Sequence, residues 1–218
     1  MVFNHLIEKY TTFMFDFDGV IADTNQIKKE NVLQAVSSHL ELPDAQKFVD
    51  DFVSKNGIPR EIKFKKKFGT GDIYHDVMKR YESLNKVSFL NTKLIDGVSG
   101  FIKKLKIYEK KMIILSGGQR SEIDSILAAH DLIDYFDFIF SGPSKKKTNL
   151  AHARSEISGP LLYFGDSQQD FRLSVEARLD FVFVSSKTQF TGWRKAIMTA
   201  NMDNNALRTI NDFFDIIY

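Results

Sequence analysis

Residues 13–20 read Phe-Met-Phe-Asp-Phe-Asp-Gly-Val, an apolar run that carries two carboxylates and stops at a glycine. The run from Thr12 to Phe17 predicts a buried strand that ends in a turn. Asp16 and Asp18 stand two residues apart, so on a strand their side chains would share one face. Buried acids are costly unless a positive group neutralises them, and Mg²⁺ is a hard cation that prefers oxygen ligands. The run therefore indicates a magnesium site, and the alternative is a strand that simply ends in two solvated acids.

The length, net charge and cysteine content of the chain exclude several kinds of site and of binding partner. The chain has 218 residues, a length that suits one domain or one domain with an insertion. Its formal net charge of +2 gives no case for binding to nucleic acid or to a membrane surface. The absence of cysteine excludes disulfides, thiolate metal sites and cysteine catalysis. Glu8 and Lys9 stand where a signal peptide would be apolar, and no run approaches a membrane span, so we expect a cytoplasmic protein.

Residues 24–91 show apolar side chains at helical spacing and no pattern typical of a strand. Thr24 is a candidate cap for the first helix of this stretch. Four short helices are expected, over about 24–40, 48–53, 60–68 and 73–84. We interpret 24–91 as an all-helical domain inserted into another domain, which is made of 1–23 and 92–218.

After residue 92 short apolar segments alternate with helical ones. Such alternation predicts an α/β fold of the Rossmann-like type, with a parallel sheet and right-handed crossovers. Ligands of these sheets bind beyond the carboxyl ends of the strands, so polar residues at those ends are the candidates for a site. We expect strands over 111–115, 136–140, 161–164 and 181–184, helices over 97–107, 119–129, 146–157 and 167–177, and a C-terminal helix that carries Leu207, Ile210, Phe213, Phe214 and Ile217.

The expected strand ends carry acids, a serine and a run of lysines. Each has an ordinary explanation by itself, since Ser116 could cap a helix, the lysines could be solvated and Asp166 could belong to a turn. Together they resemble the four motifs of the haloacid dehalogenase superfamily, which are matched in chain order by Asp16-Phe17-Asp18-Gly19-Val20, Ser116, Lys145–Lys147 and Gly165-Asp166-Ser167-Gln168-Gln169-Asp170. The helical insertion resembles the small cap of the phosphoglycolate phosphatase-like and β-phosphoglucomutase-like members.

The resemblance implies a chemistry for the acids. Asp16 would be the nucleophile that attacks phosphorus and gives an aspartyl-phosphate intermediate. Asp18 would act as the general acid and then as the general base. A Mg²⁺ ion would lie between the carboxylate and the phosphate, held by Asp16, the backbone carbonyl of Asp18 and Asp166.

The resemblance also implies the contacts to the phosphoryl group. Ser116 and the amide of Gly117 would hold phosphoryl oxygens, and a lysine would neutralise their charge. Asp170 would orient this lysine or the waters of the metal.

The lysine itself is one of three neighbours. We choose Lys146, because it stands four and seven residues before Leu150 and Ala153, on the helix face that we expect to be buried. Lys145 and Lys147 remain rivals, and an exposed start of a helix would explain any one of the three equally well.

The helical insertion should set substrate specificity. The loop that begins at Asn56 leads into a helix, and its glycine and amides could face an anion. Arg60 and Lys63 are three residues apart and share a helix face. We expect Asn56 and Arg60 to contact an acidic or hydroxylated substrate, and the alternative is a solvated helix face.

The favoured function is a Mg²⁺-dependent phosphatase that hydrolyses a small phosphorylated metabolite. A sugar phosphomutase is the alternative, but β-phosphoglucomutase carries a histidine four residues beyond the threonine of its first motif. Counted from Thr24, that position is Lys28 here. A metal-independent dehalogenase would lack the second aspartate of the first motif, whereas Asp18 is present. A non-catalytic binding protein on the same fold is disfavoured, because every expected catalytic residue type is present.

Overall fold

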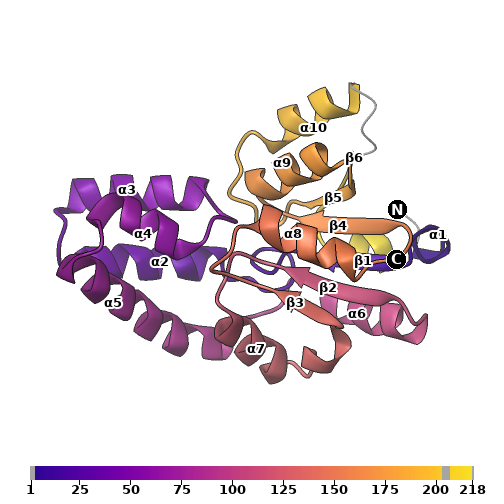
Figure 1. The fold of residues 1–218 in the computed structure, drawn as a ribbon, viewed down its shortest axis with the longest axis horizontal. Coiled ribbons are helices and arrows are strands. Elements are labelled where there is room, and N and C mark those ends of the chain that lie inside the picture. Colours follow the sequence, from indigo (N-terminus) through magenta and orange to yellow (C-terminus); the bar gives the residue numbers. More distant parts are fainter. Residues whose placement is uncertain (1–2, 203–206, 218) are drawn as a thin grey trace.

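A parallel sheet forms the larger lobe of the computed structural model, which describes residues 3–202 and 207–217 (Figure 1). The sheet has six strands in the order β3-β2-β1-β4-β5-β6, and neighbouring strands are parallel. In the centre, Phe15 of β1 pairs with Ile114 of β2 and Phe164 of β4. The strands are β1 (Thr12–Phe15), β2 (Lys111–Leu115), β3 (Phe138–Phe140), β4 (Leu161–Gly165), β5 (Asp180–Val184) and β6 (Leu207–Ile210). The predicted α/β, Rossmann-like fold is confirmed.

Helices cover both faces of this sheet, because both faces of its strands are apolar. Phe13 and Phe15 of β1 lie in one buried cluster with Phe101, whereas Met14 lies in another with Leu150. In the described part of the chain, no helix combines the length and the apolar composition needed to cross a membrane. The helices of this lobe are α1 (Phe3–Lys9), α6 (Val98–Ile107), α7 (Arg120–Ala129), α8 (Lys146–Ser155), α9 (Gln168–Ala177), α10 (Trp193–Met202) and α11 (Phe214–Ile217), with 3₁₀ turns over Phe89–Asn91 and Ile133–Tyr135.

The C-terminal segment departs from the prediction of one helix through Leu207, Ile210, Phe213, Phe214 and Ile217. Residues Leu207–Ile210 form the edge strand β6, which is parallel to β5, and helix α11 covers only Phe214–Ile217. Apolar residues three apart suit a helix, but backbone pairing with β5 and burial of Ile210 and Phe213 in the sheet core outweigh that spacing. The prediction of a helix at Leu207 and Ile210 was therefore wrong.

Two smaller differences concern a helix before the first strand and the start of strand β3. Helix α1 precedes the first strand and was not predicted, although it buries Phe3 and Leu6 against the sheet. The strand expected over 136–140 begins at Phe138, because the chain before it forms the 3₁₀ turn Ile133–Tyr135. Both differences fall in short segments, where periodicity carries little information.

Four helices form the second lobe, at left in Figure 1, and residues 24–91 contain no strand. They are α2 (Asn25–Val36), α3 (Leu42–Ser54), α4 (Arg60–Phe68) and α5 (Asp72–Ser88). Helix α3 begins earlier than expected, since Pro43 sits in its first turn, where a missing N–H is harmless. Val49, Phe64 and Tyr81 belong to an apolar cluster separate from those of the sheet. This separate core supports our proposal that 24–91 is a cap domain.

The two chain crossings between the lobes lie side by side. The amide of Asp23 donates to the carbonyl of Lys93 at 2.9 Å, and the amide of Ile95 donates to the carbonyl of Ile21 at 2.9 Å. Both crossings therefore sit at one place in the fold, which is the arrangement that a hinge between a cap and a sheet domain requires.

Candidate active site

Five polar side chains meet beyond the carboxyl ends of the central strands, and each is at most 5 % exposed. Asp16 follows β1, Ser116 follows β2 and Asp166 follows β4. Lys146 begins α8, and Asp170 lies in the first turn of α9. The parallel sheet thus gathers side chains that are far apart in the sequence, because all its strands end at the same edge.

Lys146 lies between two of the acids. Its Nζ is 2.7 Å from Asp16 Oδ1 and 2.6 Å from Asp170 Oδ1. Burial alone would lower the pKa of Lys146, but the two carboxylates outweigh it and raise the pKa, so the side chain stays charged. Leu150 and Ala153 are buried on the same helix, as expected.

The two neighbouring lysines are exposed to solvent. Lys145 is the exposed residue that precedes α8. Lys147 is also exposed, and its Nζ pairs with Glu176 at 3.0 Å. Of the three rivals, only Lys146 therefore contacts the acids of the site.

Both carboxylate oxygens of Asp170 are engaged. Oδ1 accepts from Lys146 and from the hydroxyl of Tyr163, and Oδ2 accepts from the amide (3.1 Å) and hydroxyl (2.5 Å) of Ser167 in a capping box. Burial alone would raise the pKa of Asp170, but Lys146 and these donors lower it. Asp170 thus holds Lys146 in place. Tyr163 was missed, since its only signal in the sequence is a polar tip inside an otherwise apolar strand.

Three acids of the site lie close enough together to hold a cation. Carboxylate oxygens of Asp16, Asp166 and Asp170 lie within 4.8 Å of one another. Burial and the charge of Asp170 raise the pKa of Asp16 to about 8, and burial together with Asp16 raises the pKa of Asp166 well above its usual range. A divalent cation would reverse both shifts. Since Asp170 is already engaged, Asp16 and Asp166 are the carboxylates left for an ion, and these hard oxygen donors fit Mg²⁺.

Gly19 makes room for this arrangement. Its φ is +76°, and a Cβ there would lie 2.1 Å from Asp166 Oδ2 and 2.5 Å from Asn25 Nδ2. Asn25, the first residue of α2, donates to Asp166 Oδ2 at 2.8 Å. Only glycine combines this backbone conformation with such a close approach. The contact of Asn25 was not anticipated from the sequence.

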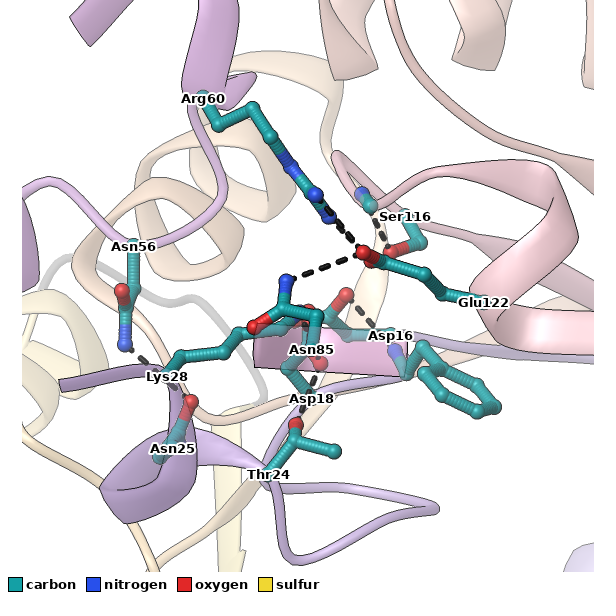
Figure 2. Close-up of polar contacts among 12 residues, drawn as sticks. Asp16, Asp18, Thr24, Asn25, Lys28, Asn56, Arg60, Asn85, Ser116 and Glu122 are labelled. Carbon is teal, nitrogen blue, oxygen red and sulfur yellow. Dashed lines mark hydrogen bonds and ion pairs between the residues drawn. The ribbon is translucent and has the colours of Figure 1, made fainter. Parts of the chain in front are cut away.

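The carboxylate of Asp18 points away from the acid cluster, toward the cap. Its Oδ1 accepts from the hydroxyl of Thr24 and from Lys28 Nζ at 2.5 Å (Figure 2). Burial alone would raise the pKa of Asp18, but the Lys28 ammonium and these hydrogen bonds lower it. Thr24 precedes α2, but its hydroxyl makes no capping hydrogen bond and donates to Asp18. The side chain of Asp18 is therefore free of the metal cluster, which leaves its backbone carbonyl as the ligand that we expect.

The turn after β2 presents a hydroxyl and two glycines to the site. Ser116 Oγ accepts from the amide of Gly118 at 3.0 Å, so its own proton remains available to a ligand. Gly117 and Gly118 line a cavity above Asp16. A Cβ on Gly117 would lie 2.8 Å from the carbonyl oxygen of Gly57, so this glycine lets the loop of the cap approach closely.

This cavity lies between the two lobes. Its volume is about 40 Å³. The sheet lobe contributes Asp16, Asp18, Gly117 and Gly118, and the helical lobe contributes Asn25, Lys28, Phe52, Asn56, Gly57, Ile58, Arg60, Lys63 and Tyr81. The walls of the cavity therefore come from both lobes.

Arg60 lines the cavity but already has an acidic partner. Its guanidinium donates through both terminal nitrogens to Glu122 of α7, at 2.7 Å for the longer contact (Figure 2). The guanidinium carbon also lies 4.9 Å from the centre of the Tyr81 ring. Asn85 donates to the same carboxylate at 3.0 Å. Arg60 therefore ties the helical lobe to the sheet lobe. Glu122 was missed by sequence reasoning, and its position in the first turn of a helix offered no distinguishing signal.

Asn56 and Lys63 complete the cap side of the cavity. Asn56 Nδ2 donates to Asn25 Oδ1 at 3.3 Å, so it contacts a residue that holds Asp166. Arg60 and Lys63 are 5 % and 9 % exposed, so the helix face that they share is buried against the site and is not a solvated face.

A family model of haloacid dehalogenase-like hydrolases matches residues 13–184, which include the acids after β1 and β4, Ser116 and Lys146. The chain belongs to this family. Its resemblance to haloacid dehalogenase-like proteins, inferred from the four strand ends, is thereby confirmed. No curated protein matches the chain.

Solved structures share the fold of this haloacid dehalogenase-like hydrolase. A predicted phosphoglycolate phosphatase from Haemophilus somnus 129pt has 15 % identity and a TM-score of 0.75, over 94 % of this chain and 96 % of that one. A haloacid dehalogenase-like family hydrolase from Streptococcus pneumoniae has 17 % identity and a TM-score of 0.70, over 94 % and 95 %. A predicted phosphatase from Clostridium acetobutylicum has 18 % identity and a TM-score of 0.69, over 92 % and 94 %. At these identities the likeness shows the fold alone.

Proposed function

We propose that this haloacid dehalogenase-like hydrolase is a Mg²⁺-dependent phosphatase that acts on a small phosphorylated metabolite through an aspartyl-phosphate intermediate. One observation carries the proposal: a buried lysine, Lys146, contacts Asp16 and Asp170 beside Asp166. A carboxylate can attack a phosphoryl group only where fixed positive charge offsets their mutual repulsion. The family and the printed descriptions of related structures as phosphatases support this assignment.

Two aspartates perform the covalent steps in this proposal. Asp16 attacks phosphorus and becomes the acyl phosphate, while Asp18 gives a proton to the leaving oxygen. Asp18 then takes a proton from the water that hydrolyses the acyl phosphate. The lowered pKa of Asp18 keeps its carboxylate deprotonated in the free protein, which is the form that accepts a proton in this second step, and the negative charge of a bound substrate raises the pKa for the first.

The other residues hold the phosphoryl group. The hydroxyl of Ser116 and the amide of Gly117 donate to its oxygens, and Lys146 neutralises the charge that develops on them. Asp170 fixes the position of Lys146. A bound Mg²⁺, with Asp16, Asp166 and the backbone carbonyl of Asp18 as its protein ligands, would screen the repulsion between nucleophile and phosphate.

Hydrolysis is favoured over phosphoryl transfer between positions of a sugar. The residue four positions beyond Thr24 is Lys28, and its ammonium is 2.5 Å from Asp18 Oδ1. An ammonium held in this way is not the imidazole that β-phosphoglucomutase carries at the matching position. We therefore propose that water, and not a second sugar phosphate, receives the phosphoryl group.

The test is an assay with p-nitrophenyl phosphate. Activity should require Mg²⁺, disappear on chelation and not return with Ca²⁺, which takes more ligands at longer distances. Asp16→Asn should reduce turnover to background, since an amide attacks phosphorus poorly, while the fold remains intact by circular dichroism. Asp44→Asn, at an exposed position in the first turn of α3, is the matched control and should be fully active. Full activity of the Asp16→Asn protein would overturn the mechanism.

A further inference from the structure

The cap side of the cavity carries three cations, and two of them are neutralised. Lys28 pairs with Asp18 at 2.5 Å, and Arg60 pairs with Glu122. Lys63, on α4, also lines the cavity, yet no carboxylate of residues 3–202 and 207–217 forms an ion pair with it. A buried cation without an acidic partner is rare and needs a reason.

The contacts of Lys63 leave part of its ammonium free. Nζ donates to the backbone carbonyls of Phe52 at 3.1 Å and Lys55 at 3.4 Å, and it lies 3.7 Å from the centre of the Phe52 ring. An ammonium has three N–H donors, so these contacts use two. Apart from these two carbonyls and the Phe52 ring, no protein group of the described residues takes up the ammonium, and Lys63 lines the cavity.

The surroundings of Lys63 favour an anion. Burial, together with the positive charges of Lys28, Arg60 and Lys55, lowers the pKa of Lys63 to about 7, against the opposing influence of Asp18. A negative group placed beside Lys63 would relieve this repulsion. Within the described residues, this buried ammonium has backbone carbonyls and a ring beside it but no carboxylate paired with it.

We propose that Lys63 binds a carboxylate at the far end of the substrate, so that the substrate class is a small phosphomonoester that also bears a carboxylate. This inference rests on the proposed phosphatase function, because it places the phosphoryl group at Asp16 and the carboxylate at Lys63. Asp16 and Lys63 line the same cavity, so one small molecule can contact both.

A second role of Lys63 must be separated from this one. The carbonyls of Phe52 and Lys55 belong to the C-terminal end of α3, where a lysine side chain can satisfy unpaired carbonyls. A capping role would affect stability and all substrates alike. A carboxylate-binding role changes the preference between a charged and a neutral substrate.

The experiment compares 2-phosphoglycolate with 2-hydroxyethyl phosphate, which has a neutral hydroxymethyl group in place of the carboxylate. We expect the wild-type protein to prefer 2-phosphoglycolate in kcat/KM. Lys63→Met should lower the ratio of the two kcat/KM values by about 10- to 150-fold, the loss of one hydrogen bond to a charged group. Lys66→Met, at an exposed lysine of the same helix, should leave the ratio unchanged.

Two results would overturn the proposal. One is an unchanged ratio in the folded Lys63→Met protein, which would leave Lys63 with the capping role alone. The other result concerns binding, and it is needed if neither ester is hydrolysed and the proposed phosphatase function fails. Titration calorimetry of both esters in the presence of Mg²⁺ then decides. Tighter binding of 2-phosphoglycolate that Lys63→Met abolishes supports the carboxylate site, and equal or undetectable binding of the two esters refutes it.

Discussion

The two halves of the cavity balance their charges differently. On the sheet side, Lys146 is shared between Asp16 and Asp170, which belong to the same lobe. On the cap side, Lys28 and Arg60 reach across to acids of the sheet lobe, and Lys63 reaches none. The sheet side is therefore organised by itself, whereas the cap side depends on closure and, in our proposal, on substrate.

The two sides therefore differ in which of their contacts depend on the lobes being packed together. Contacts within one lobe survive when the cap opens, so Asp16, Lys146 and Asp170 stay in place. The pairs of Arg60 with Glu122 and of Lys28 with Asp18 must separate on opening, and so they resist it.

The largest effect is expected on the sheet side. Lys146→Met removes the cation between Asp16 and Asp170 and should cost about 3–5 kcal/mol of the free energy of unfolding, because it leaves buried charges uncompensated. Phosphatase activity should fall with every substrate. Lys147→Met is the control, since Lys147 pairs with Glu176 on the surface, and it should change the stability by at most about 0.5 kcal/mol. Urea unfolding without added divalent cation measures both, and equal stability of the two variants would contradict an internally balanced sheet side.

A smaller effect is expected for the contact between the lobes. A double-mutant cycle with Arg60→Met and Glu122→Gln should give a coupling energy of about 0.5–3 kcal/mol, as for partly buried ion pairs in direct contact. Arg120 and Asp124 form a matched pair on the exposed face of α7, and their coupling should be about 0.3–0.5 kcal/mol. Urea unfolding measures both cycles. If the two couplings were equal, Arg60 would not be a tie between the lobes.

The smallest effect is expected at Lys63, and it has the opposite sign. Lys63→Met should stabilise the free protein by about 0.5–2 kcal/mol, or a few degrees in Tm, since it removes a buried unpaired charge. The pKa of Lys63 is about 7 in the folded protein against an ordinary 10.5. Between these values the unfolded chain binds the extra proton, so wild-type stability rises with pH across that window.

The pH dependence provides the check on this last prediction. The penalty of the buried charge is complete below pH 7 and shrinks as pH rises toward 10.5, so the gain in Tm should be larger at pH 6.5 than at pH 9. Lys66→Met serves as the control and should show no such difference. A Tm for Lys63→Met below that of the wild type at pH 6.5 would mean that capping of α3 outweighs the cost of burial.

Much of the sheet side could be predicted from the sequence. The apolar run before Asp16 and the glycine after Asp18 mark a strand and its turn, and these are local patterns. The choice of Lys146 followed from the positions of Leu150 and Ala153, since helix periodicity orders burial along one element. Edge strand β6 was missed, because its few residues acquire their structure from pairing with β5.

The cap side was less predictable, because its contacts join residues from different lobes. Arg60 was expected over the substrate, and the structure gives its guanidinium to Glu122, a residue 62 positions away. The spacing of Arg60 and Lys63 correctly placed them on one helix face, but it carried no information on which of the two has an acidic partner.

By itself, the sequence determined the fold class, the order of the strand-end motifs and the helix face on which Lys146 stands, because periodicity and motif order are properties of neighbouring residues. Tertiary structure alone decided which charges neutralise one another: Asp170 with Lys146, Asp18 with Lys28, Glu122 with Arg60, and none with Lys63 in the described part of the chain. The reason is physical, since an ion pair depends on a separation of a few ångströms between side chains. That separation is set only when the two lobes pack together.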